Sequence, residues 1–247
     1  MLRLPAVAGQ FYPANPQELA AFVRRLTNQP NAQQKSHVKA CLVPHAGYIY
    51  SGHVAGAVFA KIHIPRSVVI LGVRHLPRGA DVAITSEGAW RTPLGDVPVE
   101  EARLPQDPRA HAEEHSLEVE LPFLQVALRS FALIPLAVGD AAPDEVASVI
   151  EQLWGGAETL IVVSSDLSHY QPYADAQRAD AATAKEILAL GRLTPDDACG
   201  AVPVNGLLLA AKRRGLRADL IDLRNSGDTA GDKKRVVGYG AFAFYER

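Results

Sequence analysis

"TLIVVSSDLSHY", residues 159–170, joins an apolar strand to a polar cluster. Residues 160–163 are apolar without interruption, which is typical of a parallel strand that is buried on both faces. The chain then turns polar and carries Asp166 and His169. In open parallel sheets, ligands bind outside the carboxyl ends of the strands. The stretch therefore predicts a parallel α/β sheet and places two chemically active side chains where a site is expected.

Two other stretches repeat this pattern. "VKACLVPHAGY" (38–48) carries an apolar run followed by His45, and "SVVILGVRH" (67–75) carries another followed by His75. A helix predicted between them completes a βαβ unit, which places both histidines at the same edge of the sheet. If the strand at 160–163 is a parallel neighbour, we expect His45, His75 and His169 to line one pocket.

Composition narrows the class of protein. The chain has 247 residues, of which 48% are hydrophobic, and no linker divides it, so we predict a single domain over residues 1–247. A net charge of −2 gives no sign of nucleic-acid or membrane-surface binding. The two cysteines and the lack of a signal-peptide pattern favour a cytoplasmic protein. The segment 27–37 alone has the composition of a disordered stretch.

Strand and helix patterns alternate along the chain. Asn15 is a good N-cap for a helix that starts at Pro16, and Ser51 is a plausible cap for the next. Residues 81–99 suggest a peripheral β-meander. The predicted helices cover 16–26, 51–62, 115–130, 140–154, 174–190 and 203–214, and the predicted strands include 38–43, 68–71, 131–138, 160–163 and 236–244. This order predicts a three-layer α/β/α fold with a mixed, largely parallel sheet.

The strand-end residues His45, His75, His169 and Asp166 are nitrogen and oxygen donors of the kind that hold iron, manganese, copper or zinc. Two histidines and one carboxylate with open positions form the ligand set of non-haem iron(II) oxygenases. The simpler alternative for each histidine is a hydrogen bond to a loop backbone, and for Asp166 a role in the turn. Three histidines after three buried strands favour the site.

Three further residues are candidates beside it. Cys199 comes just before the helix predicted from Pro203, where a helix N-terminus favours a thiolate that can bind metal, although a lone cysteine is more often a small buried hydrophobe. His115 directly precedes another predicted helix and could support a metal ligand or act as a general base. Glu118 is sufficiently explained by the dipole of that helix. We interpret His37, His53, His63 and His111 as surface or packing residues.

Seven blocks of the sequence, taken in order, resemble one family. They are "PAVAGQFYP" (5–13), "VPHAGYIYSG" (43–52), "ILGVRH" (70–75), "RTPLGDV" (91–97), "EHSLEVELPFL" (114–124), "SSDLSHY" (164–170) and "NSGDTAGDKKRVVGYGAF" (225–242). They are similar to successive blocks of the Memo family, whose bacterial and archaeal members are often called AmmeMemoRadiSam system protein B. The resemblance covers about residues 4–244, nearly the whole chain.

The resemblance implies a fold similar to that of the class III extradiol dioxygenases. It also implies that His45, His75 and Cys199 are the metal-binding positions, and that Asp166 and His169 line the same pocket. The implied metal is iron or copper and the implied chemistry is oxidative, with no established substrate. A thiolate ligand favours copper(I), whereas a carboxylate suits iron(II) or manganese, so the choice of third ligand bears on the choice of metal. We favour Cys199.

Arg74 departs from the family pattern, which is usually Gly-Pro-x-His, commonly with Asn or Ser before the histidine; here the block reads "GVRH". A cation beside a metal ligand opposes a bound dication by roughly 1–4 kcal/mol per charge pair. We therefore expect weaker metal binding unless Arg74 points away from the site or pairs with a carboxylate.

Two functions remain open from the sequence. The first is a redox metal binder or a non-haem-metal oxidoreductase that uses the strand-end histidines, with the third ligand position taken by Cys199, His169 or Asp166. His115, His169 and Asp166 would then be its catalytic candidates. The second is a non-catalytic binding protein whose pocket captures a peptide or a small anionic ligand with Arg74 and the imidazoles.

Overall fold

The computed structural model describes residues 1–28 and 35–246, so residues 29–34, within the segment predicted to be disordered, lie outside the described part. A mixed sheet forms the centre of the structure, in the strand order β10-β11-β2-β8-β3-β7-β4. Its middle consists of four parallel strands: β2 (Ala40–Val43), β8 (Thr159–Ser164), β3 (Ser67–Val73) and β7 (Ala132–Val138). The parallel sheet predicted from the apolar runs is confirmed.

Antiparallel strands extend the sheet at both edges. The strand β11 pairs with β2, β10 pairs with β11, and β4 pairs with β7 at the other edge. A short strand, β9, pairs with the start of β11. Their bounds are β4 (Val82–Ile84), β9 (His169–Gln171), β10 (Arg217–Asn225) and β11 (Val236–Tyr245). The sheet is therefore mixed, with its parallel strands in the middle.

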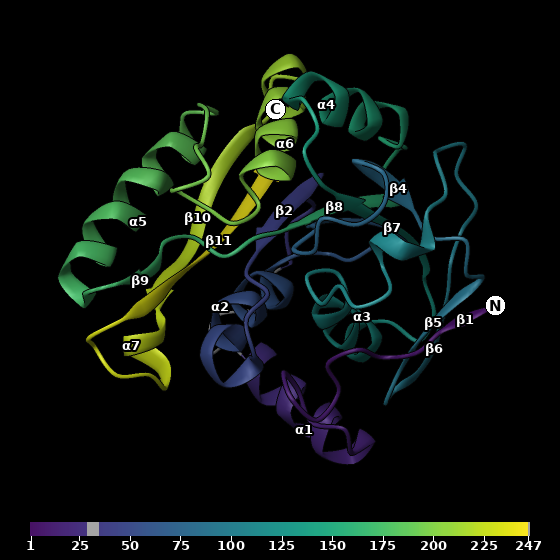
Figure 1. Ribbon diagram of the computed structural model, residues 1–247, viewed down its shortest axis with the longest axis horizontal. Helices are drawn as coiled ribbons and strands as arrows, with labels where there is room; N and C mark the ends of the chain where they lie inside the picture. Colours follow the sequence, from purple (N-terminus) through teal and green to yellow (C-terminus); the bar gives the residue numbers. More distant parts are fainter. Residues whose placement is uncertain (29–34, 247) are drawn as a thin grey trace.

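Helices cover both faces of the sheet (Figure 1). One layer contains α1 (Pro16–Thr27), α2 (Tyr48–Lys61) and α3 (Leu121–Ala127), and the other contains α4 (Pro143–Gln152), α5 (Tyr173–Leu188) and α6 (Ala201–Arg213). Successive residues of β8 face opposite layers: Leu160 and Val162 pack with the first, and Ile161 and Val163 with the second. This α/β arrangement agrees with the prediction. Across the described residues, no helix is long and apolar enough to cross a membrane.

The predicted N-cap is observed in α1 but not in α2. Asn15 Oδ1 accepts backbone N–H groups of the first turn of α1, as predicted. In contrast, α2 begins at Tyr48, with Gly47 as its N-cap, so the prediction of Ser51 as the cap is wrong. The Ser51 hydroxyl instead donates to the Ala46 carbonyl at 2.8 Å, which ties the first turn of α2 to the loop after β2.

The peripheral meander expected over residues 81–99 is divided between two sheets. β4 joins the edge of the main sheet, so that part of the prediction is wrong. β5 (Ala89–Thr92) and β6 (Gly95–Pro98) form the expected hairpin, which pairs with β1 (Leu2–Arg3) in a separate sheet. The N-terminal strand is thereby brought beside the segment that precedes α3.

That segment is less helical than expected. The helix predicted over residues 115–130 is reduced to a 3₁₀ turn, Glu118–Glu120, and α3. Pro122 lies in the first turn of α3, where its missing N–H removes no hydrogen bond from the helix. Residues 111–117 remain a loop that can place Glu114 and His115 at the sheet edge.

A buried ion pair anchors this loop. Arg3 Nη1 donates to Glu118 Oε2 at 2.7 Å, and both side chains are buried. Glu118 also accepts hydrogen bonds from the N–H groups of Ala6 and Val7 and from the Tyr12 hydroxyl. The helix-dipole explanation of Glu118 therefore does not account for its position, because the carboxylate lies at the centre of a buried network.

Arg3 also binds the backbone of the loop directly. Its Nε donates to the His111 carbonyl at 3.0 Å and its Nη2 to the Glu114 carbonyl at 2.7 Å, while its guanidinium lies 4.1 Å from the Trp90 ring centroid. One side chain from the N-terminal strand thus fixes the course of the loop that carries Glu114 and His115.

Replacement of Arg3 by alanine should lower the free energy of unfolding by about 3–5 kcal/mol, because the substitution leaves Glu118 as a buried charge without its ion-pair partner. The matched control is Arg91→Ala, which breaks a pair with Asp96 whose side chains are 50% and 42% exposed. That change should cost less than about 1 kcal/mol. Urea denaturation measures both values, and equal losses would contradict a central role for Arg3.

Candidate functional site

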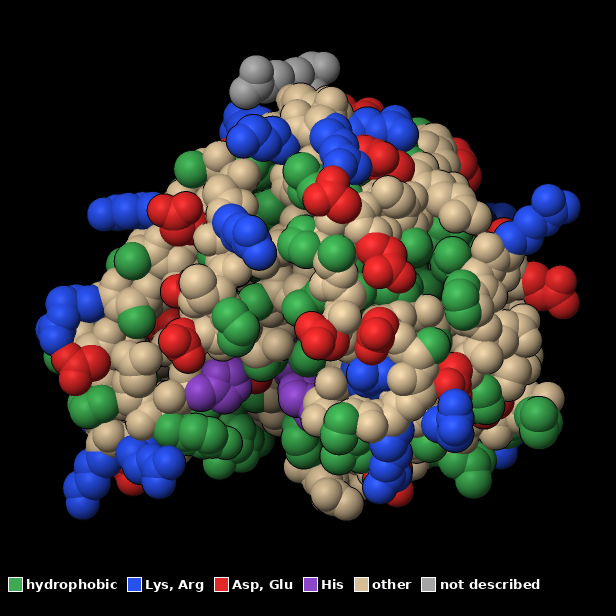
Figure 2. All heavy atoms as spheres, turned by 45° about the horizontal axis from the view of Figure 1, so that its top comes forward, with side chains coloured by type: hydrophobic (Ala, Val, Ile, Leu, Met, Phe, Trp, Pro, Cys, Tyr) green, Lys and Arg blue, Asp and Glu red, His purple; other side chains and the backbone are tan. Residues whose placement is uncertain are grey.

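A cavity of about 1120 Å³ opens at the carboxyl ends of the central strands. His45 follows β2, His75 follows β3 and His169 follows β8, and all three line this cavity. Figure 2 shows histidine side chains within a hollow of the surface. The prediction that the three histidines share one pocket is confirmed.

Strand order is the reason for this convergence. β8 lies between β2 and β3 and is parallel to both. In its last register position, Ser164 is opposite Val43 on one side and Gly72 on the other. The three strands therefore end at the same level, and the loops that follow them start side by side.

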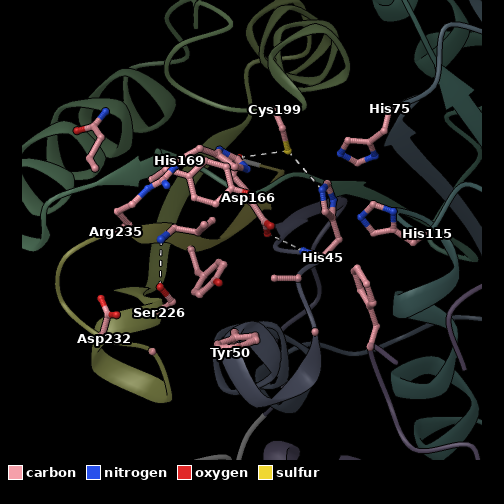
Figure 3. Close-up of a pocket in the computed structure, with 18 of the residues that line it drawn as sticks. His45, Tyr50, His75, His115, Asp166, His169, Cys199, Ser226, Asp232 and Arg235 are labelled. Carbon is pink, nitrogen blue, oxygen red and sulfur yellow. Dashed lines mark hydrogen bonds between the residues drawn. The ribbon is translucent and has the colours of Figure 1, made fainter. Parts of the chain in front are cut away.

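Three donor atoms are brought together at one end of the cavity. The ligand atoms of His45, His75 and Cys199 all lie within 4.8 Å of one another. His45 Nε2 is 3.3 Å from Cys199 Sγ, and the His45 and His75 ring centroids are 5.3 Å apart. In Figure 3 these side chains and His115 lie on one side of the cavity, and Arg235, Ser226 and Asp232 lie on the other.

His45 is buried and held at three points. Its backbone N–H donates to Asp166 Oδ1 at 2.8 Å, its Nδ1 lies 3.0 Å from Ser164 Oγ, and its Nε2 faces Cys199. Burial lowers the pKa of His45 well below its usual value, and the neighbouring imidazoles of His115 and His75 lower it further. The imidazole is therefore neutral and has a lone pair available for a metal.

His75 is oriented by Glu114. The carboxylate accepts the backbone N–H of His75 at 2.7 Å and lies 2.9 Å from its Nδ1, and it also accepts the Ser116 N–H at 2.8 Å. Burial alone lowers the pKa of His75, but hydrogen bonds with Cys199 and Glu114 outweigh it and raise the pKa to about 10. A carboxylate behind an imidazole is typical of metal-binding histidines, because it fixes the orientation of the ring and turns the other nitrogen toward the metal.

His115 lies beside these ligand atoms without being one of the closest three. Its ring stacks on His75 with 4.5 Å between centroids and lies 4.8 Å from the Phe11 ring. Burial lowers its pKa, which favours a neutral imidazole. A second group of donors within 4.8 Å consists of His75, Glu114 and His115. His115 therefore lies against His75 in the cavity wall, and its role as a support or a base stays a prediction.

Asp166 is in the cavity wall, but its carboxylate has a structural partner. It is buried, and Oδ1 accepts the N–H of His45. Burial raises the pKa of Asp166 to about 7, although backbone hydrogen bonds from His45 and Ala46 oppose the rise. Among the described residues, Asp166 does not belong to either group of clustered donors. The carboxylate therefore positions the His45 loop.

His169 lines the cavity from β9, a strand that sequence analysis missed. Its Nδ1 lies 2.7 Å from the Leu167 carbonyl, so Nε2 is the nitrogen left for other partners. The next residue, Tyr170, has a φ of 58°, in the left-handed region that is costly for a tyrosine. His169 lies outside both donor groups formed by the described residues.

The two cysteines have different surroundings. Cys199 lies two residues before α6, close to where the sequence placed it, and its N–H donates to the Asp166 carbonyl at 3.3 Å. Cys41 is buried within β2, and burial raises the pKa of its thiol, so it remains a protonated core residue. Cys199 alone of the two lines the cavity.

Arg74 points away from the donors. Its Nη1 donates to the carbonyls of Gly79 and Ala80, and its Nη2 lies 3.2 Å from Asp81 Oδ1. The side chain does not line the cavity. Arg74 therefore meets the condition under which we expected no repulsion of a bound dication. The suggestion that Arg74 captures anionic ligands in this pocket is wrong.

The cation that does line the cavity is Arg235. Its guanidinium lies 5.1 Å from the Tyr170 ring centroid. Within the described part of the chain it takes part in no ion pair. Tyr50 and Tyr239 also line the cavity.

The remaining histidines agree with the expectation of surface or packing roles. His37 and His63 stack with 4.8 Å between centroids, and His53 is exposed on α2. His111 is fully buried, with Nε2 2.9 Å from the Ala83 carbonyl, and burial lowers its pKa to about 4.

Three residues that support the site have no role predicted from the sequence. Glu114 holds His75, Ser164 lies behind His45, and Glu120 lies 3.1 Å from Ser164 Oγ. Glu114 had one available signal, a carboxylate next to a candidate histidine. Ser164 and Glu120 had none, since their contact joins the end of β8 to a 3₁₀ turn 44 residues earlier.

Comparisons with known proteins agree with the sequence blocks. A family model described as "Memo-like protein" matches residues 3–243. A "MEMO1 family protein" of Aquifex aeolicus is 39% identical over 272 residues, covering 98% of this chain and 99% of the relative. Another, from Archaeoglobus fulgidus, is 36% identical over 265 residues with the same coverage. A crystal structure of an uncharacterized Escherichia coli K12 protein aligns with a TM-score of 0.47 and 10% identity, covering 82% of this chain and 98% of that one. The matches over nearly the whole chain confirm the resemblance, and the chain belongs to the Memo family.

Proposed function

We propose that the chain binds iron or copper through His45, His75 and Cys199 and acts as a redox metal binder or a non-haem-metal oxidoreductase. The observation that carries the proposal is the convergence of two imidazoles and one thiol from three separate loops, with all ligand atoms within 4.8 Å of one another. Exposed acidic clusters are common on proteins, but this set is partly buried, uses no carboxylate and lies inside a cavity.

The donor geometry fits a metal ion. A tetrahedral ion with bonds of about 2.05 Å to nitrogen and 2.3 Å to sulfur places these two atoms about 3.5 Å apart. His45 Nε2 and Cys199 Sγ are 3.3 Å apart, close to that value. His75 Nδ1 faces Glu114, which leaves Nε2 as the ligand atom once the metal displaces its proton.

The type of donor favours particular metals. A thiolate is a soft ligand that selects copper(I), and imidazole suits both copper and iron. Bound iron or copper would supply one-electron redox chemistry at its open coordination positions. Asp166, whose carboxylate binds the His45 backbone, would contribute by fixing the loop.

The rest of the cavity would receive an organic substrate. A volume of about 1120 Å³ is slightly above the range of about 300–1,000 Å³ that is typical of small-molecule sites. His115 and His169 line the same space and could accept or donate a proton. Similarity to class III extradiol dioxygenases and a cytoplasmic location remain part of this proposal, as does the organisation of residues 1–247 as a single domain.

A second candidate function is ligand binding without catalysis. The observation that favours it is Arg235, a cation in the cavity wall that takes part in no ion pair with another described residue. A carboxylate or phosphate on a peptide or small molecule would pair with this guanidinium, while the molecule packs on the tyrosines. The anionic-ligand hypothesis thus shifts from Arg74 to Arg235.

Metal analysis after anaerobic purification, followed by dioxygen uptake with simple catechols, separates the two functions. Bound iron or copper with measurable uptake supports the oxidoreductase. Metal-free protein with tight binding of anionic peptides supports the second function. We expect metal to be bound and catechol turnover to be weak, because a shared fold does not carry a shared substrate.

Replacement of Cys199 by serine should lower copper(I) affinity by more than about 100-fold, beyond the 10-to-100-fold typical of a residue that supports a ligand. Asp166→Asn should stay within that lower range, because its oxygen binds the His45 backbone. Cys41→Ala is the matched thiol control and should leave affinity unchanged. Isothermal titration measures the copper(I) affinity of all three variants. Unchanged affinity in Cys199→Ser, together with loss of binding in Asp166→Asn, would overturn the choice of Cys199.

Metal binding should release a proton from His75. With a pKa of about 10, this imidazole is protonated at pH 7.5, and the metal must displace that proton. Apparent affinity should therefore rise with pH up to about 10. In Glu114→Gln the imidazole loses a bond that favours its charged form, so its pKa falls and fewer protons should be released at pH 7.5. Titration in buffers of different ionisation enthalpy counts the protons, and equal counts would contradict the assignment.

A further inference from the structure

A row of buried groups lies behind His45. Its Nδ1 is 3.0 Å from Ser164 Oγ, and Ser164 Oγ is 3.1 Å from Glu120 Oε1. On the other side of the ring, Nε2 is 3.3 Å from Cys199 Sγ. Ser164 and Glu120 are both fully buried. A continuous line of hydrogen-bonding groups thus runs from the core, through the imidazole, to the cavity.

The single hydroxyl hydrogen of Ser164 limits this line to two arrangements. If the hydroxyl donates to Glu120, it can only accept from Nδ1–H of His45, and Nε2 keeps its lone pair. If the hydroxyl donates to Nδ1, then Nε2 carries the hydrogen and cannot bind a metal. The partner of Ser164 therefore decides which nitrogen of His45 is a ligand.

We propose that Glu120 and Ser164 are positioning residues that hold the His45 hydrogen on Nδ1 and leave the Nε2 lone pair facing Cys199 and the cavity. The inference rests on the proposed metal site and deepens it, since it states how one ligand is kept ready to bind. His75 is held by Glu114 directly, whereas His45 is held by a carboxyl group through an intervening hydroxyl.

The state of Glu120 suits this role. Its second oxygen, Oε2, has no hydrogen-bond partner in the part of the chain that the structure describes. Burial raises the pKa of Glu120 well above its usual value, and the nearby Asp166 acts in the same direction. With its hydrogen on Oε2, a neutral Glu120 keeps Oε1 as a carbonyl oxygen that accepts the Ser164 hydroxyl, and it places no bare charge in the core.

The energetic cost of burying Glu120 indicates that this residue serves the site and does not stabilise the fold. A buried carboxyl group with half of its hydrogen-bonding capacity unused is costly, and an apolar side chain of similar size is often neutral or stabilising in its place. Glu120 therefore does something that leucine would not do in the fold. Its one hydrogen bond leads to His45 through Ser164.

The test is Glu120→Leu, with zinc(II) as the spectroscopically silent metal probe. Without its acceptor, Ser164 should donate to His45 Nδ1, so nitrogen-15 spectra of the metal-free protein should show the hydrogen on Nε2 in place of Nδ1. Zinc affinity should fall 10-to-100-fold, the range typical of a lost ligand support. The denaturation midpoint should stay the same or rise, which a purely structural role would not allow.

Two further variants define the effect. Glu120→Gln offers the same carbonyl acceptor and should keep both the Nδ1–H form and an affinity within about threefold of the wild type. Ser164→Ala removes the acceptor of Nδ1–H and should give a mixture of the two forms even if Glu120→Leu does not fold. Ser168→Ala is the control, since Ser168 is a buried serine that takes no part in the line from Glu120 to His45.

Persistence of the Nδ1–H form in Glu120→Leu, or in Ser164→Ala where the former does not fold, overturns the inference. An unchanged zinc affinity in the same variant overturns it as well. A wild-type protein that binds no metal overturns the proposed function instead, and the comparison of His45 forms in metal-free protein then decides the inference alone.

Discussion

Parallel pairing of β8 with β2 on one side and β3 on the other is the constraint on which the site depends. Val163 is opposite Leu42 in β2 and opposite Leu71 in β3, so these three strands advance in step to the same edge. Their apolar side chains are buried in both layers, and a one-residue slip of any strand would turn its core residues to the wrong layer. The register that the core enforces is therefore also the register that brings His45 and His75 to within ligand distance of Cys199.

A second constraint comes from outside the sheet. The loop before α3 carries Glu114 and His115, and it has little helical structure of its own to hold it. Arg3 fixes this loop through two backbone carbonyls and the Glu118 carboxylate. Because the guanidinium cannot lose its charge and its donors have a fixed geometry, it fixes the course of the loop more firmly than a lysine would. The site is thus held by the core on one side and by a buried ion pair on the other.

The strands and the pocket could be predicted from the sequence because apolar runs report burial on both faces, and strand ends then share an edge. The start of α1 could also be predicted, because the Asn15 side chain caps the backbone N–H groups of the residues that directly follow it. The exact start of α2 could not, because the Ser51 hydroxyl bonds to the loop before the helix. The direction of Arg74 was likewise undetermined, since its partners are the carbonyls of the turn that follows and Asp81.

Three carboxyl groups of one short segment show why contacts decide roles that sequence cannot. Glu118 receives four hydrogen bonds, one of them from a guanidinium, and Glu114 binds His75 and the Ser116 N–H. Those donors offset the cost of burying a charge, and hydrogen bonds with His75 hold the pKa of Glu114 at about 2 despite burial. Glu120 has one neutral hydroxyl partner and cannot offset that cost, so it is driven to the neutral form. The same residue type therefore serves as an ion-pair anchor, as a charged support for one imidazole and as an uncharged support for the other, according to the number and charge of the donors around it.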